Sequence, residues 1–232
     1  MYRALCTLAA VSLLAAPAAA QVTNFSQDVN DAIDAGLGWL DARGAFNANS
    51  SAGAAAGLVA LALLEKRQSA DQNAPPIGYQ NANAADRARL DRVMGFIINR
   101  ARNASFYAYQ DGGDLMALAV YLRSGGPDAA GARAAINAVF DRIRQNQNNA
   151  GYWCYRNGGC NDSSTTQLVM AGLAAAKGVF SDPAFADANR AAQLDQLVSR
   201  CAQGYANNGQ NGGLGGDKGH GYITGRAASY QQ

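Results

Sequence analysis

The sequence predicts an all-α protein built from a repeated pair of helices. No segment shows the alternation of apolar and polar residues that marks a half-buried strand, whereas apolar residues recur at helical spacing along the chain. The order amphipathic helix, aromatic or polar loop, apolar helix occurs three times, and one amphipathic helix and a loop follow. Because one pair cannot bury its own apolar helix, adjacent pairs must stack with the apolar helices inside. About three and a half helix pairs are therefore expected.

The first pair covers residues 26–67. Ser26 is predicted to cap the first helix, which ends near Gly44. The apolar face of that helix consists of Val29, Ile33, Leu37 and Leu40. The second helix extends from about Ala52 to Arg67 and is apolar enough to be buried, and residues 68–81 form a linker with two prolines.

The pattern returns twice. An amphipathic helix over residues 85–102 leads through an aromatic loop, residues 105–113, into a buried helix over 114–123. The next helix has Pro127 in its first turn, where a missing N–H costs nothing, and extends to about Gln147. An apolar helix follows over 165–178. The last helix is expected to begin at residues 181–183 and to end near Cys201.

The first twenty residues read as a secretory signal peptide. Arg3 precedes an apolar run, Ala4 to Leu14, and Ala18-Ala19-Ala20 matches a cleavage site. Residues 21–232 then form one domain, which is predicted to be secreted or periplasmic and to contain no membrane span. Without Arg3 the formal net charge falls from +2 to +1, and 16% of the residues are charged. Such a chain has no electrostatic reason to bind nucleic acid.

Three cysteines remain after the predicted cleavage. Cys154 and Cys160 are the obvious disulfide pair in an oxidising compartment, and Cys201 is then unpaired. A zinc site is the alternative. However, the Cys-x5-Cys spacing fits no common structural zinc motif and the chain has a single histidine, so no metal is expected.

One loop carries a recognisable motif. Ile143-x3-Gln147-x3-Gly151-x-Trp153 matches the Q-x3-G-x-W element that recurs between the helix pairs of squalene and hopene cyclases, and residues 96–107 keep the spacing in an eroded copy. The chain therefore resembles the terpenoid cyclase and protein prenyltransferase superfamily over about residues 27–230. The resemblance implies an α/α-toroid, in which this motif has a structural role.

The residues of the motif have predicted structural tasks. The Gln147 amide can satisfy orphan N–H groups at a helix end, and Gly151 permits a tight turn. Ser164 and Gln167 have the spacing of a capping box that opens the following helix. The predicted structural set is Ile143, Gln147, Gly151, Trp153, Ser164 and Gln167.

The chemistry of the catalytic relatives is not visible in the sequence. The chain has neither the D-x-D-D acid motif of the cyclases nor the zinc-ligand pattern of the prenyltransferases. Asp28, Asp31, Asp34, Asp111 and Asp114 are expected on solvated helix faces or at N-caps. No cofactor is predicted, and whether the protein is an enzyme stays open. A site is expected where the loops meet the inner helix ends, with the candidate ligand-binding residues Tyr152, Trp153, Tyr155, Asp162, Tyr205, His220 and Tyr222.

Three functions are consistent with these observations. The first is a non-catalytic module that binds an apolar or polymeric ligand or a protein partner. The second is an incomplete cyclase-type or prenyltransferase-type enzyme that acts on an isoprenoid or lipid. The third is a carbohydrate-active enzyme with paired carboxylates. Because the chain supplies fewer pairs than a closed toroid needs, it is either truncated at its C-terminus or an open crescent, whose apolar edge invites self-association.

Overall fold

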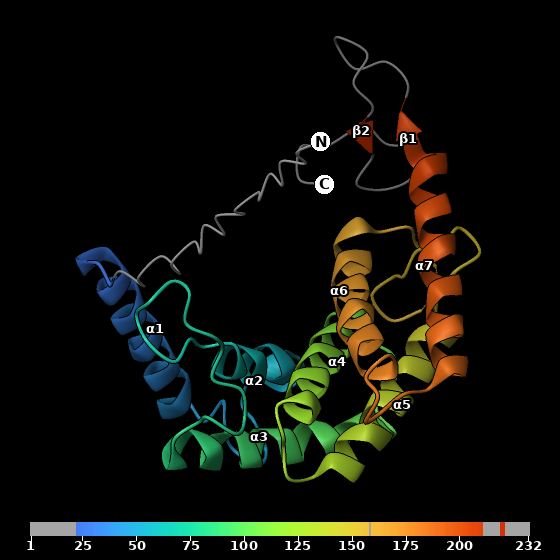
Figure 1. Cartoon of the computed structure of the whole chain (residues 1–232). Coiled ribbons are helices and arrows are strands. Elements are labelled where there is room, and N and C mark those ends of the chain that lie inside the picture. The colour runs from blue at the N-terminus through green and yellow to red at the C-terminus, as the bar shows by residue number, and fades with distance from the viewer. Residues whose placement is uncertain (1–21, 158, 211–218, 221–232) are drawn as a thin grey trace, which may run out of the picture.

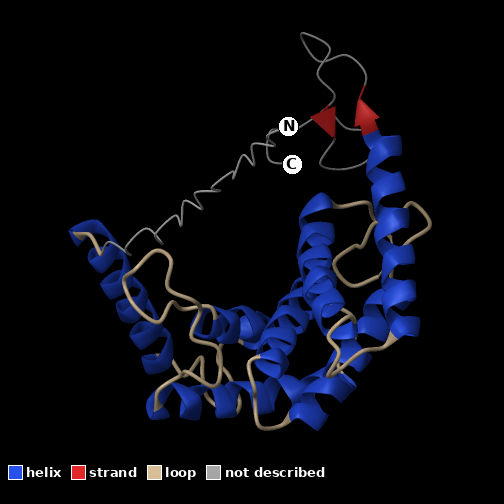
Figure 2. Ribbon diagram, in the orientation of Figure 1, coloured by secondary structure: helices blue, strands red, loops and turns tan. Residues whose placement is uncertain are grey.

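A computed structural model describes residues 22–157, 159–210 and 219–220 (Figure 1). It confirms the all-α class, with seven α-helices and one 3-10 helix among these residues (Figure 2). The helices are α1 (Asn24–Ala42), η1 (Gly53–Ala55), α2 (Ala56–Leu64), α3 (Ala84–Asn103), α4 (Ala108–Arg123), α5 (Ala129–Gln145), α6 (Ser163–Phe180) and α7 (Ala188–Asn208). Two short strands, β1 (Gly209–Gln210) and β2 (Gly219–His220), pair antiparallel after α7.

The helices form an open arc in two layers. Figure 1 shows α1, α3, α5 and α7 along the outside of the arc and α2, α4 and α6 along the inside. Helix α4 packs against α2 on one side and α6 on the other, and α3 packs against α5 in the outer layer. The apolar core between the layers is continuous, and its largest fully buried side chains include Phe46, Leu90, Met94, Phe140 and Trp153.

Glycines let the inner helices approach one another closely. A Cβ atom on Gly112 of α4 would lie 2.3 Å from the Leu168 carbonyl oxygen of α6. A Cβ atom on Gly57 of α2 would lie 2.4 Å from the Gly113 carbonyl carbon of α4. Only a residue without a side chain fits at such distances. The inner layer is therefore held by backbone packed directly against backbone.

Several helix starts differ from those expected. Thr23, not Ser26, caps α1, and the two side chains form a reciprocal capping box. Asp128 caps α5 by accepting a hydrogen bond from the Gly131 N–H at 2.8 Å, so Pro127 lies before the cap and not in the first turn. Helix α4 begins at Ala108, six residues before the predicted start at 114. The expected aromatic loop thus supplies the first turns of α4.

The last helix begins later and ends later than predicted. Asp187 accepts a hydrogen bond from the Arg190 N–H at 3.0 Å, which provides the N-terminal cap that residues 181–183 were expected to supply. Helix α7 continues beyond Cys201 to Asn208. Beyond Cys201 the buried residues of α7 are Gly204 and Asn208, and the other side chains of this segment are partly or fully exposed, where polar residues are compatible with a helix.

The first pair of helices is unequal in length. Helix α1 has 19 residues, whereas α2 has 9 and ends at Leu64 instead of Arg67. The chain reverses here, since the Ile77 N–H donates to the Lys66 carbonyl at 2.7 Å and the Gly78 N–H to the Leu64 carbonyl at 2.9 Å. These bonds replace the helical ones that would have continued α2.

The predicted apolar face of α1 is only partly buried. Leu37 lies in the core and Leu40 is half-buried, but Val29 and Ile33 are each 42% exposed. The expectation that all four pack inside was therefore wrong for the N-terminal half of the helix. The short α2 ends before it can cover that half.

Candidate functional site

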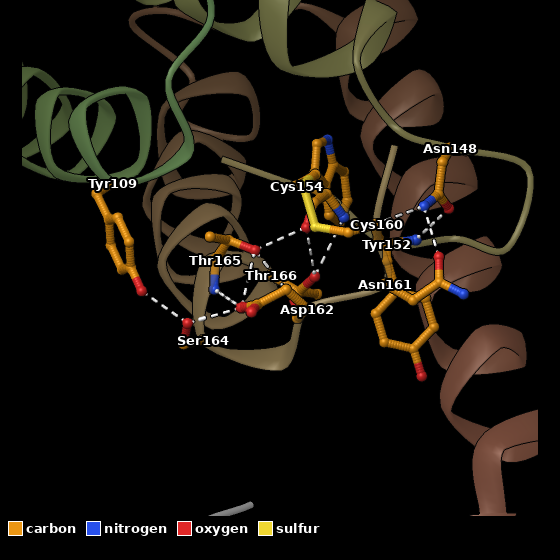
Figure 3. The surroundings of a disulfide bond; sticks show 11 residues. Tyr109, Asn148, Tyr152, Cys154, Cys160, Asn161, Asp162, Ser164, Thr165 and Thr166 are labelled. Carbon is orange, nitrogen blue, oxygen red and sulfur yellow. Dashed lines mark hydrogen bonds between the residues drawn. A yellow bond between two sulfur atoms is a disulfide. The ribbon is translucent and has the colours of Figure 1, made fainter. Parts of the chain in front are cut away.

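The loop between α5 and α6 is closed by a disulfide. Cys154 and Cys160 are bonded, with their Cα atoms 5.1 Å apart, which confirms the predicted pair (Figure 3). Cys201 is a free, buried cysteine on α7, and burial raises the pKa of its thiol to about 11. A thiol with such a pKa stays protonated at neutral pH, so Cys201 is an unreactive packing group.

Asp162 organises the start of α6. Its Oδ1 atom accepts hydrogen bonds from the Thr165 N–H at 3.0 Å and from the Ser164 hydroxyl at 2.7 Å (Figure 3). The cap of α6 is therefore Asp162, and the predicted capping box of Ser164 and Gln167 was wrong; Gln167 is exposed. The carboxylate takes precedence because it accepts more strongly than a hydroxyl at the positive end of the helix.

Trp153 and Tyr152 are buried in the same loop. The Trp153 indole N–H donates to the Ile143 carbonyl at 2.8 Å, and its backbone N–H donates to the Thr166 hydroxyl at 3.1 Å. Tyr152 packs against half-buried Tyr205 of α7, with ring centroids 4.9 Å apart. Since Trp153 and Tyr152 are at most 1% exposed, neither offers a surface to a ligand.

Gln147 joins the loop to the last helix. Its Nε2 atom donates to the Gly151 carbonyl at 3.0 Å and to the Leu197 carbonyl of α7 at 2.9 Å. The expected partners were N–H groups, but the groups that the Gln147 amide binds are two carbonyls. Gly151 has φ +88°, and a Cβ atom there would lie 2.2 Å from the Arg200 carbonyl oxygen. The turn thus requires glycine both for its conformation and for the approach of α7.

We expect Gln147→Ala to lower the stability of the protein by about 1–3 kcal/mol, because the change removes two part-buried hydrogen bonds, one within the loop and one from the loop to α7. Gln203→Ala is a matched control, since Gln203 is an exposed glutamine of α7 whose side chain bonds the exposed Asn207. Thermal unfolding of both variants measures the effect. Equal melting temperatures for the two variants would contradict the structural task of Gln147.

Three tyrosines gather where α4 and α6 begin. This tyrosine cluster consists of Tyr107, Tyr109 and Tyr155. The Tyr109 ring lies 5.9 Å from that of Tyr107 and 5.7 Å from that of Tyr155, measured between centroids. The Tyr109 hydroxyl is 2.6 Å from that of Ser164 (Figure 3), and the guanidinium of Arg156 lies 4.6 Å from the Tyr107 ring centroid. The cluster is therefore held from both helices.

The cluster reaches the surface through Tyr155. Its side chain is 42% exposed, and Tyr107 and Tyr109 are half-buried. The Tyr155 carbonyl accepts from the Ala108 N–H at 2.9 Å, which fixes the disulfide loop to the start of α4. The negative charge of Asp162 raises the pKa of Tyr155, so its phenol remains protonated at neutral pH.

Two of the predicted ligand-binding residues belong to the last part of the chain. His220 lies in β2 opposite Gly209, and Tyr222 lies outside the described residues. Tyr107 and Tyr109 were missed as site residues, because no local sequence signal connects them with Tyr155 in the disulfide loop. Tyr107 is the N-cap residue of α4, and Tyr109 lies in the first turn of that helix.

Two buried ion pairs connect the inner and outer layers. Arg142 of α5 donates to both carboxylate oxygens of Asp111, at 2.7 and 3.1 Å, and to the Ala101 carbonyl at 2.8 Å. Arg100 of α3 donates to Asp114 at 2.5 Å. Both aspartates have no exposed surface. The prediction that they lie on a solvated face or at an N-cap was wrong, because α4 begins early and turns them towards α3 and α5.

Burial raises the pKa of both of these carboxyl groups. Desolvation raises the pKa of Asp114 to about 7, against the opposing effect of Arg100. It also raises the pKa of Asp111, against the hydrogen bonds from Arg142. The prediction of a solvated face holds for the other three aspartates, because Asp28, Asp31 and Asp34 are exposed on α1.

Comparisons with protein families, with curated proteins and with solved structures find no match to this chain. Within residues 22–157 and 159–210 and in β2, no group of three or more His, Cys, Asp or Glu side chains is placed to hold a metal ion. No helix in the described part of the chain is both long and apolar enough to cross a membrane. The disulfide is compatible with secretion.

Proposed function

We propose that this chain is a secreted, non-catalytic helical module of the α/α-toroid type that binds a hydroxyl-rich polymer, such as a polysaccharide, through the tyrosine cluster. The Q-x3-G-x-W motif and the alternation of outer and inner helices support the toroid assignment. The main observation in favour of polymer binding is the set of three neighbouring tyrosine rings at the N-terminal ends of α4 and α6. Tyr155 of this set is exposed.

The chemistry of the cluster suits a polymer with both apolar faces and hydroxyl groups. A tyrosine ring offers a flat apolar face and a hydroxyl that donates or accepts. Ser164 and Arg156 add further polar groups at the edge of the rings. Tyrosine also loses little conformational freedom on binding, and the disulfide and the Ala108–Tyr155 hydrogen bond hold the surface in place beforehand.

The state of the nearby acids supports binding over catalysis. Glycoside hydrolysis needs two carboxyl groups that face the scissile bond. Asp111 and Asp114 are fully buried and paired with arginines, and Asp162 is 4% exposed and caps α6. None of these three presents a carboxylate to a ligand lying on the tyrosine cluster.

The test is the affinity of the disulfide-bonded protein for a panel of soluble neutral and acidic polysaccharides, measured by affinity electrophoresis. We expect at least one polysaccharide to bind and Tyr155→Ala to weaken that binding about tenfold, which corresponds to ~1.4 kcal/mol. Trp39→Ala is the matched control, since Trp39 is a 57% exposed aromatic residue on α1. Retained affinity in Tyr155→Ala, no binding by any polymer, or release of shortened products would each overturn the proposal.

A further inference from the structure

A second surface feature lies at the other end of the arc. A groove of about 640 Å³ separates the N-terminal half of α1 from the segment that follows α2. One wall is formed by Phe25, Val29 and Ile33, which are spaced four residues apart and are 72%, 42% and 42% exposed. The opposite wall is formed by Ala62 and by residues 65–67, 69–70 and 72–73.

The groove exists because the first helix pair is mismatched. Helix α1 is about 28 Å long and α2 about 14 Å, from 19 and 9 residues. The next two pairs are closely matched, with 20 and 16 residues in α3 and α4 and 17 and 18 in α5 and α6. The apolar stripe of α1, formed by Phe25, Val29 and Ile33, therefore continues beyond the end of α2 and is exposed to solvent there.

The opposite wall carries charges of both signs. Glu65, Lys66 and Arg67 line it where α2 ends. Lys66 pairs with Asp34, whereas neither Glu65 nor Arg67 forms an ion pair among the residues that the structure describes. The Arg67 Nη1 atom donates to the Ala74 carbonyl at 2.9 Å, and the bridge between Arg67 and Pro76 fixes the backbone. A cationic group thus stands at a defined position beside the apolar stripe.

The size of the feature distinguishes between a protein partner and a small ligand. A stable protein interface takes up about 800 Å² and about 20–30 residues on each partner, whereas thirteen residues line this groove. A concave site of about 640 Å³ instead lies within the range of small-molecule sites, which hold ligands of about 300–1,000 Å³.

We propose that this groove binds an unbranched alkyl carboxylate of the fatty-acid type, independently of the tyrosine cluster. The alkyl chain lies along Phe25, Val29 and Ile33, where each buried CH₂ contributes about 0.8 kcal/mol. The carboxylate meets the Arg67 guanidinium, whose planar donors match it geometrically.

Isothermal titration with decanoate and with decyltrimethylammonium, both below their micelle concentrations, tests the site. The two probes share the alkyl chain and differ in the sign of the head group. We expect decanoate to bind at least tenfold more tightly. Arg67→Gln should remove this preference and Arg67→Lys should keep it. Val29→Asp, at an exposed position, should abolish binding of decanoate.

Arg102→Gln is the matched control, because Arg102 is an exposed arginine at the end of α3. It should leave the preference unchanged, and polysaccharide affinity should be unaffected in all of these variants. Equal binding of the two probes by the unmodified protein, or an unchanged preference in Arg67→Gln, would overturn the proposal. A dimer that Val29→Asp dissociates, without decanoate binding, would assign the groove to a second copy of the chain and equally overturn it.

Discussion

Gly112→Ala is expected to destabilise the protein by about 3 kcal/mol. The added Cβ atom would lie 2.3 Å from the Leu168 carbonyl oxygen and 2.6 Å from its carbonyl carbon. Both are backbone atoms of α6, so no side chain can rotate away and the two helices must separate. The separation also loosens the contact between Gly172 of α6 and Gly112, whose carbonyl oxygen would lie 2.9 Å from a Cβ atom on Gly172.

Gly95→Ala is the matched control for this change. Gly95 lies inside α3, and a Cβ atom there would meet no heavy atom within 4 Å. Alanine favours a helix over glycine by about 0.5–1 kcal/mol, so this variant should be slightly more stable than the unmodified protein. Urea unfolding followed by circular dichroism measures both variants. The same midpoint for Gly112→Ala and the unmodified protein would mean that α4 and α6 are farther apart than described.

Arg142→Met is expected to lower the free energy of unfolding by about 3–5 kcal/mol. The change removes both hydrogen bonds to Asp111 and leaves a carboxylate with no exposed surface without its counter-charge. It also removes the donor to the Ala101 carbonyl. The same unfolding measurement applies.

The cause of this loss can be separated from a simple packing defect. Asp111→Leu combined with Arg142→Met removes both charges, so the double variant should recover most of the stability. Arg144→Met is the control on the same helix, because the Arg144 side chain is 42% exposed and its ion pair with Asp141 is long, at 4.0 Å. This variant should change the stability by less than about 0.5 kcal/mol. A double variant as unstable as Arg142→Met alone would show that the charge is not the cause.

The features that the sequence predicted well are local ones. Helical periodicity placed α3 within one residue at each end, and the disulfide followed from two cysteines six positions apart. Both signals lie within a short stretch of chain. The start of α4 was misplaced because Gly112 and Gly113 were taken for a loop, whereas they serve close packing between helices.

The features that could not be predicted depend on distant partners. Asp111 and Arg142 are 31 positions apart on different helices, and no spacing rule connects them. The tyrosine cluster likewise joins Tyr109 to Ser164 across 55 positions. The sequence therefore predicted only part of the candidate site. Tyr155 and Asp162 lie in the motif loop and were predicted, whereas Tyr107 and Tyr109 come from another repeat and were not.

Arg142 also has a consequence for how the chain unfolds. In an array of helix pairs, each pair contacts only its neighbours, so one unit can open while the others stay folded. Here a single side chain from α5 binds the backbone of α3 and a carboxylate of α4. Opening α5 alone would leave the buried carboxylate of Asp111 without its counter-charge, so we expect α3, α4 and α5 to open together. Partial opening is then expected at the two ends of the arc.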